Sequence, residues 1–195
     1  SSDLIMQWVG TWAATPAPAD GVALSAPTIR MFPRISVGGE SIRIRLSNAH
    51  GTGPLNIGAV TVALRGKGAS FMPGTCRAVT FNGARSAQIR TGSLLISDPV
   101  DFPVAPLTDL AVSVYLPDEI PASFVVTGRY ARQINYYSPP GDFTADETIP
   151  ASRVTDDWYF LAGIDVLADD GVGGIVAFGD SITDGNISTH DAFCR

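Results

Sequence analysis

A chain of 195 residues, 45% of them apolar and 16% charged, has room for one large domain or one and a half small ones, and this balance excludes a disordered chain. The net charge is −6 and the 13 basic residues form no run of like charge, so we predict no nucleic-acid partner. The apolar runs are far shorter than the about 20 residues of a membrane-spanning helix, so we predict no membrane partner either.

Apolar and polar residues alternate along most of the first 168 residues. In residues 41–46 the apolar side chains are predicted to face a core, while Arg43 and Arg45 face water. Similar segments bounded by turn-forming residues are residues 56–64, 77–81, 92–96, 110–116, 123–126 and 158–167. Short strands at this spacing predict an antiparallel β-sandwich or jelly-roll-like domain over residues 1–168.

The pattern changes after the polar turn at residues 169–171. Residues 174–178 form a continuous apolar run, which is typical of strands buried on both faces of a parallel sheet. A polar turn over residues 179–185 follows at once, and turns of this kind carry nucleophiles in α/β enzymes. We therefore predict a mainly β protein in which residues 169–195 begin a second, α/β domain.

The segment IVAFGDSITDG, residues 175–185, resembles the first signature block of the SGNH, or GDSL, family of serine hydrolases. The sequence before it resembles the N-terminal β region of longer secreted bacterial members, at residues 8–12, 42–48, 97–100 and 132–142. This resemblance implies an ester hydrolase, an esterase or lipase, that needs no cofactor and no metal. It also implies a secreted or extracytoplasmic bacterial protein.

The resemblance assigns roles at the polar turn, residue by residue. Ser181 matches the nucleophile, and its backbone N–H matches one donor of the oxyanion hole. Gly179 and Asp180 match the residues that shape the turn. The chemistry then expected is attack of Ser181 on an ester, with a His held by an Asp acting first as general base and then as general acid.

The remaining catalytic groups of the family lie well downstream of this block, and only ten residues follow Gly185 here. His50 lies in the β region, and His190 follows Ser181 by nine residues, so neither matches the histidine of the family. A serine hydroxyl without a base is a weak nucleophile. We therefore expect a truncated N-terminal portion that is nearly inactive alone, or one that a second polypeptide or a second copy completes.

Two classes of function remain open at this point. The first is an SGNH ester hydrolase acting on short-chain acyl esters or on acetylated carbohydrates, with Ser181 as nucleophile. The second is a β-sandwich module that binds a carbohydrate or packs on a catalytic partner and does no chemistry. A second polypeptide that supplies the His and Asp is the partner that the first class requires.

Several other patterns have ordinary explanations beside the functional ones. The acidic spacing from Asp180 to Asp191 resembles a calcium loop, but Ile182 occupies a ligand position. Trp8, Trp12 and Trp158 favour the sandwich core over a sugar-binding platform, with Trp8 and Trp12 predicted on one face of a strand. Adjacent Tyr136 and Tyr137 must point to opposite faces, and Cys76 and Cys194 fit free thiols better than a disulfide.

Overall fold

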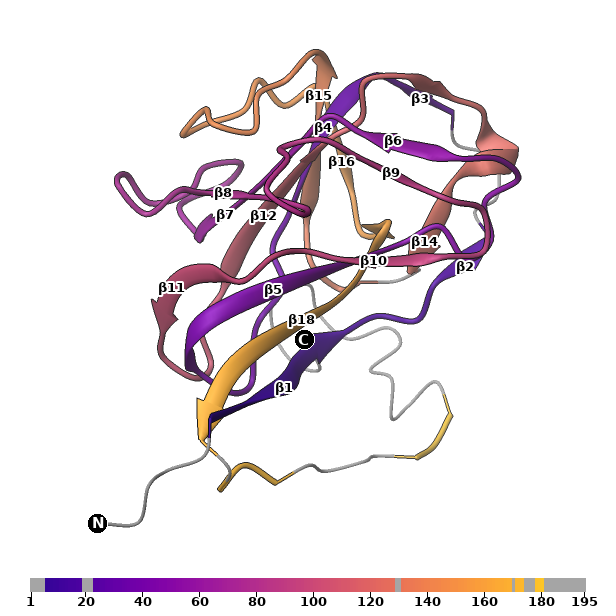
Figure 1. Cartoon of the computed structure of the whole chain (residues 1–195). Coiled ribbons are helices and arrows are strands. Elements are labelled where there is room, and N and C mark those ends of the chain that lie inside the picture. The colour runs from indigo at the N-terminus through magenta and orange to yellow at the C-terminus, as the bar shows by residue number, and fades with distance from the viewer. Residues whose placement is uncertain (1–5, 19–22, 129–130, 170, 174–177, 181–195) are drawn as a thin grey trace.

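The computed structural model describes residues 6–18, 23–128, 131–169, 171–173 and 178–180, and its regular structure is almost entirely β-strand (Figure 1). The strands are β1 (Met6–Ala13), β2 (Ala17–Pro18), β3 (Leu24–Ser25), β4 (Pro27–Met31), β5 (Gly39–Ser47), β6 (Leu55–Ile57), β7 (Ala59–Leu64), β8 (Arg77–Val79), β9 (Ala87–Ile89), β10 (Leu94–Ile96), β11 (Val100–Val104), β12 (Leu110–Tyr115), β13 (Glu119–Ile120), β14 (Val126–Gly128), β15 (Asn135–Pro140), β16 (Arg153–Thr155), β17 (Trp158–Tyr159) and β18 (Leu161–Asp169). One 3-10 helix, η1, covers Ala122–Phe124. The predicted mainly β fold is confirmed.

Two antiparallel sheets form the body of the domain. The five-stranded sheet has the order β1-β18-β5-β10, and β11 also pairs with β5. The six-stranded sheet has the order β16-β15-β4-β12-β7-β8. In Figure 1, β1, β18 and β5 run side by side in the lower half of the domain, and the strands of the six-stranded sheet lie above them. Three small sheets complete the fold, namely β13-β3, β17-β14-β2 and β6-β9.

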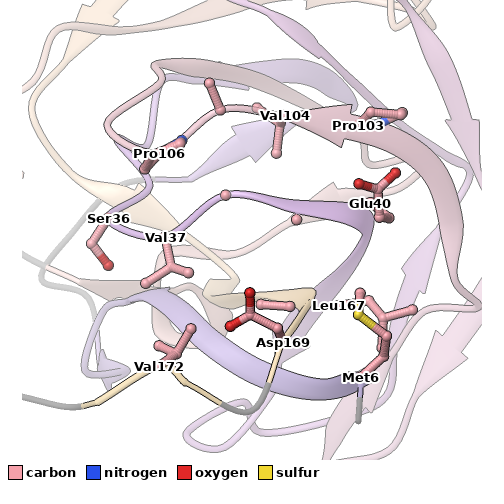
Figure 2. Close-up of a pocket in the computed structure, with 14 residues that line it drawn as sticks. Met6, Ser36, Val37, Glu40, Pro103, Val104, Pro106, Leu167, Asp169 and Val172 are labelled. Atoms are coloured by element: carbon pink, nitrogen blue, oxygen red, sulfur yellow. The ribbon is translucent and has the colours of Figure 1, made fainter. Parts of the chain in front are cut away.

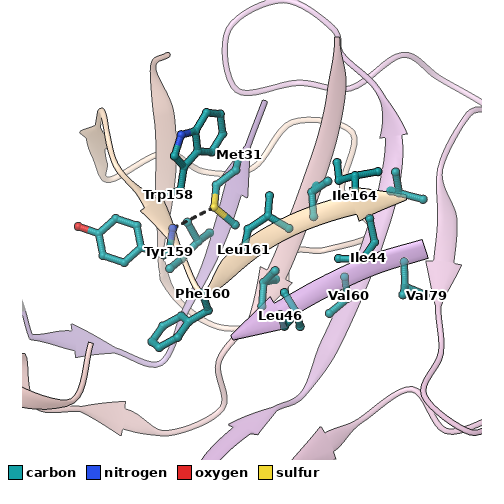
Figure 3. Packing of buried hydrophobic residues seen from close by; sticks show 14 of the residues in the cluster. Met31, Ile44, Leu46, Val60, Val79, Trp158, Tyr159, Phe160, Leu161 and Ile164 are labelled. Carbon is teal, nitrogen blue, oxygen red and sulfur yellow. Dashed lines mark hydrogen bonds between the residues drawn. The ribbon is translucent and has the colours of Figure 1, made fainter. Parts of the chain in front are cut away.

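The main core lies between the inner faces of the two sheets (Figure 3). β5 contributes Ile42, Ile44 and Leu46, all fully buried, as the alternation in the sequence predicts. Buried residues from the facing sheet include Met31 and Val60. Each such side chain contributes about 1.5–3 kcal/mol on burial, so this layer is the main source of stability.

The outer face of the six-stranded sheet is covered as well. A second apolar cluster there contains Phe32, Ala63, Phe71 and Ala111, with Cys76 and Tyr136 packed against it. All five residues of β4 are consequently buried, although apolar and polar residues alternate along it, because its polar side chains lie beneath loops on the outer face. Residues 27–31 were not among the predicted strands.

Several predicted strands differ in detail from the structure. Residues 123–126 form most of η1 and only the first residue of β14, because the chain turns after Pro121. Residues 56–64 divide into β6 and β7 at Gly58, whose N–H donates to the Tyr115 carbonyl. Residues 158–167 divide into β17 and β18 at Phe160, which has φ of 59°.

The last strand of the sandwich is a central strand. β18 pairs with β1 on one side and with β5 on the other, and it ends at Asp169, one residue beyond the predicted domain limit. Val172 then packs against the main core. Of the predicted α/β segment 169–195, residues 170, 174–177 and 181–195 lie outside the described residues.

Candidate functional site

The predicted nucleophile turn is described in part. Phe178, Gly179 and Asp180 are all exposed, and Phe178 is 100% exposed. Ser181 itself lies outside the described residues. The described part of the turn is therefore accessible to solvent and is not packed into the sandwich.

The sandwich brings no histidine of the described residues into a catalytic arrangement. His50 is exposed in the loop after β5, and its Nε2 lies 3.1 Å from the carbonyl oxygen of Pro16. His190 lies outside the described residues. Among the residues that the structure describes, no three His, Cys, Asp or Glu side chains lie close enough together to hold a metal ion.

A cavity of about 830 Å³ lies where the chain leaves the sandwich, and we name it the terminal cavity (Figure 2). It is formed by the ends of β1 and β18 together with residues 36–40 and 103–106. Two carboxylates, from Glu40 and Asp169, lie among mostly apolar walls. The hydroxyl of Ser36 also lines it but donates to the Thr11 carbonyl at 2.8 Å. The described residues of its lining include no histidine, so they form no serine–histidine pair.

The outer face of the five-stranded sheet carries a compact charged network. The Asp165 side chain is 2% exposed and lies between Arg43 and Arg45 of the neighbouring strand. Arg43 Nη2 donates to Oδ2 at 3.1 Å, Arg45 Nε donates to Oδ2 at 2.9 Å, and Arg45 Nη2 lies 2.8 Å from Oδ1. Two cations thus surround one buried carboxylate, and both arginines are on the water-facing side, as predicted.

Trp8 lies on this outer face, while Trp12 does not. The guanidinium of Arg43 lies 4.0 Å from the centroid of the Trp8 ring. Trp12 packs edge-on against Trp158, with 4.7 Å between ring centroids, and joins the main core. The prediction that Trp8 and Trp12 share one face is therefore wrong, because a β-bulge between Gly10 and Trp12 reverses the alternation.

Two residues within the upstream segments of the family resemblance have structural roles in the sandwich. The buried Asn48 amide donates to the carbonyls of Gly53 and Ile89, which closes the loop after β5. Asp98 accepts hydrogen bonds from the N–H groups of Gly83 and Asn82 and from the Thr80 hydroxyl. The bond from Gly83, followed by that from Thr80, lowers the pKa of Asp98.

The two adjacent tyrosines of β15 point to opposite faces, as predicted. Tyr137 is 4% exposed in the main core, where its ring lies edge-on to that of Tyr159. Burial raises the pKa of Tyr137 well above its usual range. Tyr136 packs on the other side of the sheet, against the second cluster. Cys76 is half-buried there, and Cys194 lies outside the described residues.

Arg30 is a buried cation that the sequence analysis did not single out. It is 0% exposed on β4, and burial lowers its pKa from 12.5 to about 10. Its guanidinium donates to the carbonyls of Ala69, Asp146 and Glu147 at 2.7–2.9 Å, and its Nε donates to Ser113 Oγ at 2.8 Å. Arg30 therefore fastens two loops onto the six-stranded sheet.

No protein-family model matches the chain, and no curated protein sequence matches it significantly. No helix in the described part of the chain is long and apolar enough to cross a membrane.

Proposed function

We propose that the chain belongs to an SGNH-type serine ester hydrolase in which Ser181 is the nucleophile. The sequence of residues 175–185 is the main support for this proposal, since these eleven consecutive residues resemble the first signature block of that family. Its place in the chain supports the same conclusion. β18, the last strand of the sandwich, ends at Asp169, and the exposed Gly179 and Asp180 follow it by about ten residues.

The proposed chemistry is acyl transfer to the Ser181 hydroxyl. Ser181 Oγ attacks the carbonyl carbon of the ester while a histidine takes its proton, and the backbone N–H of Ser181 stabilises the negative charge on the carbonyl oxygen. Gly179 and Asp180 shape the turn that presents the hydroxyl. The histidine then protonates the leaving alcohol, and water releases the acid by the same steps in reverse order.

The general base is proposed to come from outside the sandwich. His50 lies beside the Pro16 carbonyl, in a loop of the β domain, and the upstream residues Asn48 and Asp98 are engaged in holding loops and turns. We propose that a further polypeptide segment, or a second copy, supplies the His and the Asp. The β-sandwich then serves as the body on which the catalytic part is carried.

The substrates proposed are short-chain acyl esters or acetylated carbohydrates, and the setting is a secreted bacterial enzyme. These finer statements rest on the resemblance of residues 8–12, 42–48, 97–100 and 132–142 to the β region of such enzymes.

Hydrolysis of 4-nitrophenyl acetate tests the proposal, with intact masses recorded for every polypeptide in the preparation. We expect turnover only where a polypeptide supplying the His and Asp is present, because loss of a triad lowers turnover by about 10⁶. Ser181→Ala must abolish that turnover, and Ser188→Ala, a matched serine outside the block, must leave it unchanged. Turnover that survives Ser181→Ala contradicts the assignment of the nucleophile.

A second candidate function is carbohydrate binding by the outer face of the five-stranded sheet. Trp8 favours it, because this half-buried ring lies on the outer face beside Arg43 and outside the core. Aromatic faces on a flat sheet are suited to stacking on sugar rings. Titration with soluble acetylated xylan, followed by tryptophan fluorescence, tests it: binding must be lost in Trp8→Ala, and equal binding by that variant refutes it.

A further inference from the structure

A second cavity, of about 380 Å³, lies at the edge of the six-stranded sheet, away from the terminal cavity. It is an open cavity lined by β3, the start of β4, the end of β15 and the start of β16. The lining includes Leu24, Pro27, Tyr137, Pro139, Pro140 and Arg153, and we name it the proline-lined cavity. Its volume falls within the range of about 300–1,000 Å³ that is usual for sites of small molecules.

The apolar walls of this cavity are rigid. Three of the lining residues are prolines, whose φ angle is fixed by the ring. Tyr137 is 4% exposed, and its ring is held edge-on against Tyr159 at a centroid distance of 5.1 Å. Pro27 and Pro140 are register partners in adjacent strands, so the two prolines are fixed relative to each other by the sheet. A preformed wall binds a ligand without the entropic cost of ordering it.

Among the lining residues that the structure describes, one carries a charge, and that charge is positive. This residue is Arg153, in a chain whose net charge is −6. The ion pairs of the described residues involve Arg34, Arg43, Arg45 and Arg65, and Arg153 forms none. Its guanidinium is therefore available as a fork of N–H donors for an anion. Ser25, an exposed residue of β3, lines the same cavity and adds a hydroxyl.

We propose that the proline-lined cavity binds a small organic monocarboxylate with an apolar body. The carboxylate lies beside Arg153, where a guanidinium meets both oxygens of a planar carboxylate in a bidentate pair. The apolar body lies against Tyr137 and the prolines. One cation in an apolar cavity matches one negative charge, whereas a phosphate would place about two charges against a single guanidinium. The proposed binding does not depend on Ser181 or on the proposed ester hydrolysis.

Titration with 3-phenylpropanoate tests the proposal, with amide chemical shifts of the ¹⁵N-labelled chain as the readout. We expect a dissociation constant in the millimolar range, since the ligand has few atoms. The shifts must concentrate on Ser25, Ser138 and Ser152, which line the cavity. The neutral isostere 3-phenylpropanamide should bind about threefold to fivefold more weakly, because it lacks the charge that pairs with a partly exposed arginine. Equal affinity for the acid and the amide, or shifts confined to other regions, would overturn the proposal.

Substitutions at Arg153 separate the charge from the cavity itself. Arg153→Gln should reduce the affinity for the acid to that for the amide, while Arg153→Lys should retain part of the difference, since it keeps the charge and loses the fork. Arg90→Gln, an exposed arginine outside the lining, is the matched control and should bind as the parent does. Arg153 is exposed near the start of an edge strand, so its variants should keep the parent melting temperature. An Arg153→Gln variant that folds and still prefers the acid refutes the site.

Discussion

Replacement of Arg30 by Met removes the cation that holds two loops on the six-stranded sheet. Four hydrogen bonds of 2.7–2.9 Å are lost, to Ser113 and to the carbonyls of Ala69, Asp146 and Glu147. At about 1.5 kcal/mol for each bond from a charged donor, these bonds contribute about 6 kcal/mol. Burial of the charge opposes this contribution: it lowers the pKa from 12.5 to about 10, a difference that corresponds to about 3 kcal/mol.

The difference predicts that Arg30→Met lowers the free energy of unfolding by about 3 kcal/mol, which corresponds to a fall of about 10 °C in melting temperature for a domain of this size. Urea unfolding measures the first quantity. Hydrogen exchange measures the local effect. Amide exchange should accelerate most in residues 143–147, where the carbonyls of Phe143, Asp146 and Glu147 lose their donor.

Arg77→Met is the matched control for this experiment. Arg77 also donates to backbone carbonyls, those of Gly74 and Cys76, but it does so at the exposed surface. Its replacement should change the unfolding free energy by less than about 1 kcal/mol. If Arg30→Met costs no more than Arg77→Met, or if exchange in residues 143–147 is unchanged, the reasoning from buried hydrogen bonds is wrong.

Three further predictions concern the turn, the outer face and the core. The pKa of Asp98 is lowered in the folded chain, so the Asp98 carboxylate stabilises the turn fully above the usual carboxyl pKa of 3.8, and this stabilisation is lost as the pH falls through the lowered value. Amide exchange at Gly83, whose N–H donates to Asp98, should become faster as the stabilisation is lost. Asp98→Asn should remove this pH dependence. Asp165→Ala should cost about 2 kcal/mol in urea unfolding, since three contacts to a buried carboxylate vanish while the partly exposed arginines regain water; a cost near zero contradicts this. Trp12→Ala should cost about 3 kcal/mol and Trp8→Ala about 1 kcal/mol by thermal unfolding, and the reverse order would argue against the bulge that separates their faces.

Alternation of residue types was sufficient to predict the strands whose two sides differ in environment. β5 is the clearest case, because Ile44 faces the core and Arg43 faces water. β4 was missed although Ile29 and Met31 face the core and Arg30 faces the other side of the sheet, and the burial of Arg30 could not be predicted from this pattern. The environment of Arg30 is set by carbonyls more than 35 residues away in sequence, which no local pattern reveals.

The candidate sites also differ in whether a local sequence pattern can predict them. Ser181 is predicted by a motif of consecutive residues, which is a local signal. The proline-lined cavity joins β3 and β4 to β15 and β16, segments more than 100 residues apart, so its composition followed only from the fold. The bulge that sends Trp8 and Trp12 to different faces was also invisible, because it depends on how β1 meets β18.

The position of β18 has a consequence for the synthesis of the chain. β1 pairs with β18, which follows it by about 150 residues. β5 also pairs with β18, so neither strand has this neighbour until β18 has been synthesised. At about 5–20 residues per second, a ribosome needs on the order of ten seconds or more to make that interval. During this time Val9, Trp12 and the inner face of β5 have no complete sheet to join. Until Asp169 has been synthesised, these apolar side chains of the nascent chain therefore need other contacts to shield them from water.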